Sequence, residues 1–277
     1  MLDFTRIDPR LFDDVRLVIE ALAEAATVES ECIMLVGAQC RDILHRALGH
    51  TSINRATGDL DFGLALSDWE AFERVDRAFE RAGDSGIRYR ICDVLVDVMP
   101  FGAAIEDPTG IATPSPRGEE LVVFGFEDVF ERAFQLDLPG AEHHIRIPSP
   151  AGYAALKLRA WVDRSIYGEY KDAEDLATVL SWYESSGTVQ DRIYGESIQV
   201  ADRYEYDIPL ACAHLLGQDV RSQLKAVDAD DLARRLAQSD TRRLASALNG
   251  ESWNPVRGFD LSLALQAGLA SGTSTTA

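Results

Sequence analysis

The hydrophobic pattern of the chain changes near residue 150. Before that point, short apolar or alternating runs, typical of strands, are interspersed with segments of helical spacing. After it, strand patterns vanish and apolar residues recur at helical spacing. We therefore predict an α/β (α+β) domain with a small mixed sheet at 1–147 and an all-helical domain at 148–267. The small, polar residues 268–277 are expected to form a disordered tail.

The same patterns predict the individual elements. We expect strands at 32–36, 60–66, 87–91, 94–101, 121–124 and 144–147. We expect helices at 9–28, 40–48, 69–82 and 126–136 in the first domain, and at 151–162, 171–183, 208–217, 226–236 and 240–248 in the second. The segment 102–118, rich in Pro, Gly and Thr, is predicted to be a surface loop.

Composition narrows the functional classes. The 277 residues include 27 basic and 46 acidic ones, a formal net charge of −19, which argues against a broad nucleic-acid interface. Four scattered cysteines without Cys-x-x-Cys spacing argue against a zinc site, and buried thiols in a reducing cytoplasm are expected. No apolar run has the length of a membrane span, and no signal peptide is apparent, so we expect a cytoplasmic protein without a membrane partner.

An acidic pair opens the predicted strand 60–66. Asp59 and Asp61 are two positions apart, so in a strand both carboxylates point to the same face. Neighbouring carboxylates repel each other, and a hard divalent cation such as Mg²⁺ relieves the repulsion by binding their oxygens. The alternative is an edge strand with a solvated acidic face.

Two further features accompany this pair. Asp97 is the single acid within the apolar run 94–101, where a buried carboxylate needs a partner, so it is a third candidate metal ligand or a hydrogen-bonded structural residue. Gly37 and Ala38 lie where a strand gives way to a helix, and small residues there let a phosphate approach the first N–H groups of the helix. The alternative at this junction is a simple tight turn.

The second domain carries a cluster of charged residues. Lys157 lies in the predicted helix 151–162, and Lys171, Asp172 and Asp175 lie in the next helix. Lys171 and Asp175 are four apart and Asp172 and Asp175 are three apart, so these residues share a helix face. A charged, solvated face is the simplest interpretation of this spacing alone.

In order, these motifs resemble the AbiEii/AbiGii nucleotidyltransferase-like toxin family, a branch of the polymerase-β-type nucleotidyltransferases. The resemblance covers roughly Ile33 to Leu180, and no motif in the C-terminal third of the chain contributes to it. The family's Gly-Gly or Gly-Ser junction is Gly-Ala here, a mild departure. The matching motifs are Gly37-Ala38, Arg55-x-Thr57-x-Asp59-Leu60-Asp61-Phe62, Asp97 before Met-Pro-Phe, Pro148-Ser149-Pro150, Lys157, Arg164 and Lys171-Asp172-x-x-Asp175-Leu176.

The resemblance implies a nucleotidyltransferase-like fold and a set of site residues. It implies that Asp59, Asp61 and Asp97 bind Mg²⁺ in a two-metal site, with Lys157 as a fourth catalytic residue. The implied nucleotide-binding residues are Gly37, Ala38, Arg55, Thr57, Lys171, Asp172 and Asp175, and the charge of Arg41 adds it as a candidate phosphate ligand. Asp172 and Asp175 are expected to orient Lys171 or Lys157, or to contact the nucleotide.

The resemblance also implies an activity. The chain would transfer NMP from an NTP to an acceptor, as a toxin of a type IV toxin–antitoxin or phage-defence system with a cognate antitoxin. Some family members modify the 3′ end of tRNA, which makes tRNA a candidate acceptor. The acidic composition keeps open transfer to a small-molecule or protein hydroxyl, and a nucleotide-binding regulatory protein without turnover is a third alternative.

Overall fold

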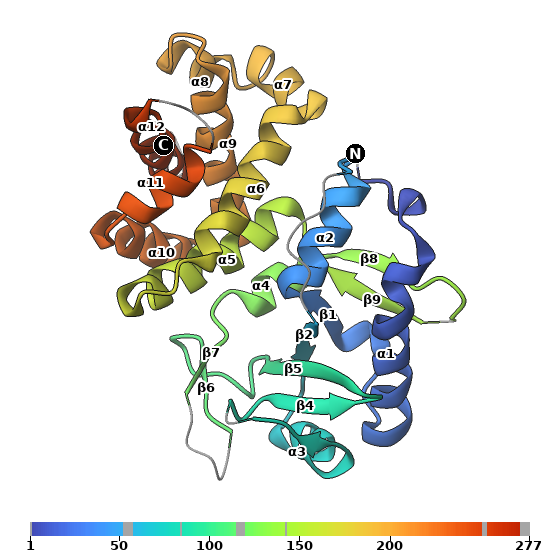
Figure 1. Cartoon of the computed structure of the whole chain (residues 1–277). Helices are drawn as coiled ribbons and strands as arrows, with labels where there is room; N and C mark the ends of the chain where they lie inside the picture. Colours follow the sequence, from blue (N-terminus) through green and yellow to red (C-terminus); the bar gives the residue numbers. More distant parts are fainter. Residues whose placement is uncertain are drawn as a thin grey trace. The chain divides into compact units, whose positions relative to one another are not determined.

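The computed structural model describes residues 2–51, 58–83, 85–114, 120–141, 143–250 and 254–271. The chain divides into two compact units, Met1–Ser149 and Pro150–Ala277 (Figure 1). The first unit holds a mixed sheet with helices, and the described part of the second is entirely helical. This confirms the predicted fold class.

A seven-stranded mixed sheet organises the first unit (Figure 1). Its strand order is β3-β4-β5-β2-β1-β9-β8, with parallel pairing between β2 and β5 and between β1 and β9. The strands are β1 (Ile33–Val36), β2 (Asp59–Ala65), β3 (Glu80–Arg81), β4 (Arg88–Ile91), β5 (Val94–Phe101), β8 (Phe134–Asp137) and β9 (His144–Ile147). The short strands β6 (Ile111–Ala112) and β7 (Leu121–Val122) form a separate pair, so the expected loop 102–118 contains one strand.

Short and long helices connect these strands. The helices are η1 (Phe4–Arg6), η2 (Pro9–Phe12), α1 (Asp13–Ala26), η3 (Ser30–Cys32), α2 (Gly37–Ala47), α3 (Trp69–Ala78) and α4 (Phe126–Glu131). Helix α1 buries an apolar stripe that includes Val15, Ile19 and Leu22, as its helical spacing predicts. Asp68 caps α3, since its carboxylate accepts a hydrogen bond from the backbone N–H of Ala71.

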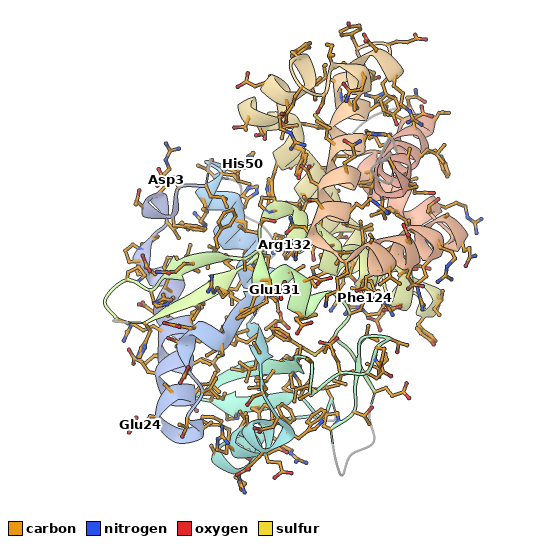
Figure 2. All side chains as sticks on the ribbon, turned by 180° about the vertical axis from the view of Figure 1, so that it is seen from behind. Asp3, Glu24, His50, Phe124, Glu131 and Arg132 are labelled. Atoms are coloured by element: carbon orange, nitrogen blue, oxygen red, sulfur yellow. The ribbon has the colours of Figure 1, made fainter. Side chains whose placement is uncertain are left out.

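Two expected helices end earlier than their patterns indicate. Helix α3 stops at Ala78, because Glu80 and Arg81 pair with β4 as an edge strand of the sheet. Helix α4 stops at Glu131, followed by Arg132 (both labelled in Figure 2), and Phe134 then begins β8. In both cases pairing with a neighbouring strand overrides a helical pattern.

Eight α-helices and one short 3-10 helix make up the described part of the second unit. They are α5 (Pro150–Arg164), η4 (Ser165–Tyr167), α6 (Lys171–Ser185), α7 (Gly187–Tyr194), α8 (Ile198–Arg203), α9 (Ile208–Gln223), α10 (Ala226–Gln238), α11 (Arg242–Leu248) and α12 (Pro255–Ala270). The core contains the fully buried Trp161 and Trp182. Helix α9 is central, since it packs on α5, α6, α7, α8, α10 and α12.

The last helix corrects the expected start of the tail. Helix α12 continues to Ala270, so residues 268–270 are helical, and the expected tail at 272–277 lies outside the described residues. A Cβ at Gly268 would collide with the carbonyl oxygen of His214, and one at Gly217 with that of Leu265. Glycine at these two positions therefore lets the backbones of α9 and α12 approach closely.

The cysteines and the helices bear on two further expectations. Cys40 and Cys212 are buried and Cys32 is half-buried, but Cys92 is exposed, so the expectation of buried thiols is wrong for that residue. None of the described helices is both long enough and apolar enough to cross a membrane.

Candidate active site

Three acidic side chains lie on one face of two neighbouring strands. In β2, Asp59 and Asp61 alternate with Leu60 and Phe62, which are buried on the opposite face. Strand β5 runs parallel to β2, and the register places Asp61 directly beside Asp97. The structure therefore brings together the three predicted acids, which we call the acid row.

An arginine extends the acid row across a third strand. Arg88 on β4 is the antiparallel register partner of Asp97. Its Nε lies 2.8 Å from Oδ1 of Asp97, and its Nη2 lies 2.7 Å from Oδ2 of Asp97 and 3.1 Å from Oδ2 of Asp59. The hydrogen bonds to Asp97 raise the pKa of Arg88, so the guanidinium stays charged.

Arg88 reaches this position through a tight hairpin. Strands β4 and β5 are joined by the two residues Cys92 and Asp93, both with positive φ, at 49° and 64°. Positive φ at both turn residues is typical of a type I′ hairpin turn. Because Ile91 pairs with Val94, counting outward from the turn aligns Arg88 with Asp97. Asp93 is thus a turn residue and not a member of the acid row.

The amino end of helix α2 adjoins the acid row. Val36, the last residue of β1, is the register partner of Asp61, and Gly37 then begins α2 with φ of 68°. A Cβ at Gly37 would lie 2.5 Å from Cγ of Asp61, so any other residue would collide with this carboxylate. The first backbone N–H groups of a helix attract anions, and here Ala38 follows Gly37 within that first turn.

The acid row supplies oxygen donors of the kind that a divalent metal ion prefers. Carboxylate oxygens are the donors that Mg²⁺ prefers, and two of the three carboxylates come from adjacent register positions. As the side chains lie, Arg88 engages two of the acids, and no described group of three or more His, Cys, Asp or Glu is arranged to hold a metal ion. The donor set therefore fits a divalent cation, provided that Arg88 gives up at least one carboxylate.

Arg41, a predicted phosphate ligand, lies one turn into α2. Its side chain is mostly buried, and its guanidinium nitrogens Nε and Nη2 lie 2.9 and 2.8 Å from Oδ1 of Asp42. This ion pair within one helix holds the guanidinium in place. The two other residues predicted to accompany it, Arg55 and Thr57, lie outside the described residues.

The second unit contains a buried ion network. Lys157 Nζ on α5 lies 2.6 Å from Oδ2 of Asp175 and 3.3 Å from Oδ1 of Asp172, both on α6. Nη2 of Arg164 lies 3.2 Å from Oδ2 of Asp172, which is fully buried. Burial alone would lower the pKa of Lys157, but the carboxylates of Asp175 and Asp172 outweigh it and raise that pKa.

The network settles which lysine the acids contact. Asp172 and Asp175 face Lys157 on the neighbouring helix, whereas Lys171 is exposed at the first position of α6. The interpretation as a solvated face is therefore wrong for both acids, since helix α6 buries them against α5. Of Lys171, Asp172 and Asp175, only Lys171 is exposed, as that interpretation predicts.

Each unit thus assembles a separate part of the predicted site. The first brings Gly37, Asp59, Asp61 and Asp97 together, and the second brings Lys157, Asp172 and Asp175 together. Sequence reasoning missed Arg88. The two-residue turn between strands 87–91 and 94–101 is the signal that identifies it, because hairpin register follows from turn length.

Comparison with known proteins agrees with the resemblance drawn from the motifs. The model of the family described as nucleotidyl transferase AbiEii toxin, type IV TA system, matches residues 20–254, well over half of the chain. The comparison with curated proteins gives no significant match.

Proposed function

Because this chain belongs to the AbiEii nucleotidyl transferase toxin family, we propose that it transfers NMP from an NTP to an RNA acceptor at the acid row. Family membership supports a nucleotidyltransferase of a type IV toxin–antitoxin system, which implies an antitoxin partner. We place its action in the cytoplasm as part of the proposal. The observation that carries the proposal is the register pair Asp61 and Asp97, with Asp59 two positions away on the same sheet face.

The reaction is an in-line attack of an acceptor hydroxyl on the α-phosphorus. A new P–O bond forms to the acceptor, the bond to the bridging oxygen breaks, and pyrophosphate leaves. Asp59, Asp61 and Asp97 would hold a divalent cation, which, when bound, neutralises charge on the phosphates and lowers the pKa of the attacking hydroxyl. Asp97 is the residue that we assign to accept the hydroxyl proton.

The remaining residues would position the triphosphate. The backbone N–H groups at Gly37 and Ala38 point from the positive end of α2 and suit phosphate oxygens. In the second unit, the exposed ammonium of Lys171 is available to an anion. We assign phosphate contacts to Arg55 and Thr57 on the family resemblance and to Arg41 on its charge. We keep for Lys157 the catalytic role that the family implies, with Asp172 and Asp175 orienting it.

The acceptor is the least constrained part of the proposal. A tRNA 3′ end presents a hydroxyl on a flexible single strand, so a site built from few contacts can receive it. The net charge of −19 favours such a limited contact over a long basic groove. The same charge favours, as a second candidate, transfer to the hydroxyl of a small molecule or of a protein.

One labelling experiment separates these acceptors. The full chain is incubated with each α-³²P-labelled NTP, Mg²⁺ and total RNA or a cell extract, and products are separated by size and by RNase or protease sensitivity. We expect RNase-sensitive label at the length of tRNA. Protease-sensitive or small labelled products would move the acceptor to the second candidate. Absence of transfer from all four NTPs to any fraction would contradict the proposed activity.

A further inference from the structure

Arg88 occupies the carboxylate oxygens that a metal ion would need. Its two hydrogen bonds take both oxygens of Asp97, and a third takes one oxygen of Asp59. A cation that used Asp97 and Asp59 as ligands would have to share or replace these contacts. The guanidinium and a metal ion therefore compete for the same carboxylate oxygens.

The position of Arg88 also suits a second state of its side chain. The Arg88 side chain is 34% exposed, compared with 17% for Asp97 and 35% for Asp59, so solvent reaches it from the same side as Asp59. It stands on a short strand held by the type I′ hairpin, which fixes its backbone while its long side chain keeps several rotatable bonds. A displaced guanidinium can thus turn away from the acids while its Cα stays in place.

The charge balance of the acid row explains the position of the Arg88 guanidinium. Three carboxylates on adjoining positions repel one another, and one guanidinium with bonds to two of them offsets part of that repulsion. Once a divalent ion supplies positive charge, Arg88 loses this role. A planar guanidinium binds phosphate oxygens as readily as carboxylates. The displaced Arg88 can therefore bind a phosphate group of the triphosphate that accompanies the metal ion.

We propose that Arg88 is the resident counter-cation of the acid row, which a divalent metal displaces and which then binds a phosphate of the incoming triphosphate. This inference rests on the proposed function, since it takes the acid row as the metal site. It makes Arg88 a phosphate-binding residue whose availability depends on metal loading. Metal and triphosphate would then bind cooperatively through one side chain.

The test is a titration of the full-length protein with Mn²⁺, followed by electron paramagnetic resonance or calorimetry. We expect Arg88→Ala to bind Mn²⁺ about tenfold more tightly than the wild type, because removal of a charged hydrogen-bonding competitor is worth that order of affinity. With Mn²⁺ bound, the same variant should bind a non-hydrolysable NTP analogue about tenfold more weakly.

A matched control and a conservative variant complete the experiment. Arg90→Ala removes an equal charge from the same face of β4, where Arg90 is exposed and pairs with Leu95, and should leave both affinities unchanged. Arg88→Lys keeps the positive charge but lacks the planar guanidinium. Its affinities for Mn²⁺ and for the NTP analogue should lie between those of the wild type and Arg88→Ala. It is the variant to measure if Arg88→Ala does not fold. Asp97→Asn, which should abolish Mn²⁺ binding, identifies the site that is titrated.

The outcomes distinguish this inference from the proposed function. The inference would be overturned if the wild type, Arg88→Ala and Arg88→Lys bound Mn²⁺ with equal affinity. If Asp97→Asn did not bind Mn²⁺ in the same experiment, the acid row would still be the metal site. Weaker Mn²⁺ binding in Arg88→Ala would overturn the inference as well. A lack of Mn²⁺ binding in every protein, with and without the NTP analogue, would overturn both the inference and the metal part of the proposed function.

Discussion

Gly37 and Asp61 lie against each other where strand β1 gives way to helix α2. The glycine has φ of 68°, and a Cβ there would lie 2.5 Å from Cγ of the aspartate. One residue thus meets two requirements, a left-handed backbone and room for a carboxylate. This contact ties the amino end of α2 to the acid row.

Substitution of Gly37 even by alanine, which adds only one methyl group, should therefore disrupt the site. We expect Gly37→Ala to lower the rate of nucleotidyl transfer about a hundredfold. The added methyl group displaces the carboxylate of Asp61, and a displacement of about 1 Å is enough for a loss of this size. Strain in the left-handed conformation should also cost on the order of 1–2 kcal/mol of stability. Steady-state kinetics and urea unfolding measure the two effects separately.

Gly187→Ala is the matched control for this substitution. Gly187 is likewise the first residue of a helix, α7, but a Cβ there would meet open space. Its activity and stability should equal those of the wild type. A Gly37→Ala protein with undiminished activity would show that Asp61 does not need its present position.

Lys157 should matter to the stability of the second unit. Lys157→Met leaves Asp172 and Asp175 buried beside each other without their shared cation, which should cost about 3 kcal/mol. Urea unfolding followed by tryptophan fluorescence suits this measurement, because Trp161 and Trp182 are buried in that unit. The paired variant Lys171→Met removes an exposed lysine and should change stability by less than about 0.5 kcal/mol.

Substitutions of the two lysines should affect different properties, stability for Lys157 and NTP binding for Lys171. If Lys171 binds phosphate, Lys171→Met raises the KM for NTP without altering the unfolding curve. A Lys157→Met protein as stable as the wild type would contradict the account of the buried ion network. Loss of activity in that stable protein would then assign Lys157 to catalysis alone.

His214 should make the protein sensitive to acid. Burial, with a smaller contribution from Arg203, lowers the pKa of His214 to about 4, and its Nδ1 lies 3.0 Å from the hydroxyl of Tyr204. The folded state keeps this ring neutral below pH 6.5, whereas the unfolded chain takes up the proton. Stability is therefore complete above pH 6.5 and falls as pH drops toward 4, by at most about 1.4 kcal/mol per pH unit.

The comparison of unfolding at pH 7.5 and pH 5 isolates this contribution. His214→Gln cannot take up the proton, so its stability should fall less between the two pH values than that of the wild type. The absolute stability of the variant is not the test, since the substitution also alters packing. Equal losses in the two proteins would show that His214 is not the acid-sensitive group.

Gly268 should be needed for the packing of α12 on α9. Gly268→Ala places a methyl group against the carbonyl oxygen of His214, so the two backbones must move apart. We expect a loss on the order of 2 kcal/mol in urea unfolding, the range of an overpacked core. Gly187→Ala, in the same unit, again serves as the control, and equal stability of both variants would contradict the close helix contact.

The acid row was predictable because its signals are local. Strand alternation fixes the common face of Asp59 and Asp61, and an acid within an apolar run marks Asp97. Arg88 depends on the register of a hairpin, which a strand pattern alone does not supply. Alternation within one strand can be predicted from the sequence pattern, whereas the register between two strands cannot be predicted from that pattern alone.

In the helical unit, local spacing was an incomplete guide. Spacing along α6 groups Asp172 and Asp175 with Lys171, but the two acids contact Lys157 on α5. Packing between helices decides that pairing, and helical spacing identifies only a shared face. Likewise the small, polar residues near Gly268 look like a tail by composition, although close packing on His214 is what requires glycine there.

The most direct test of the acid row is label transfer from α- and γ-labelled NTP, compared in three variants. Nucleotidyl transfer moves the α label and releases the γ label in pyrophosphate. Asp61→Asn and Asp97→Asn each keep the side-chain size and remove a carboxylate charge. Asp93→Asn is the control, an acid in the turn beside β5 with φ of 64°, a conformation that Asn tolerates.

We predict transfer of the α label by the wild type and by Asp93→Asn, with a loss of at least about a hundredfold in Asp61→Asn and in Asp97→Asn. Transfer of the γ label, or α transfer at the wild-type rate in both acid-row variants, would contradict the account.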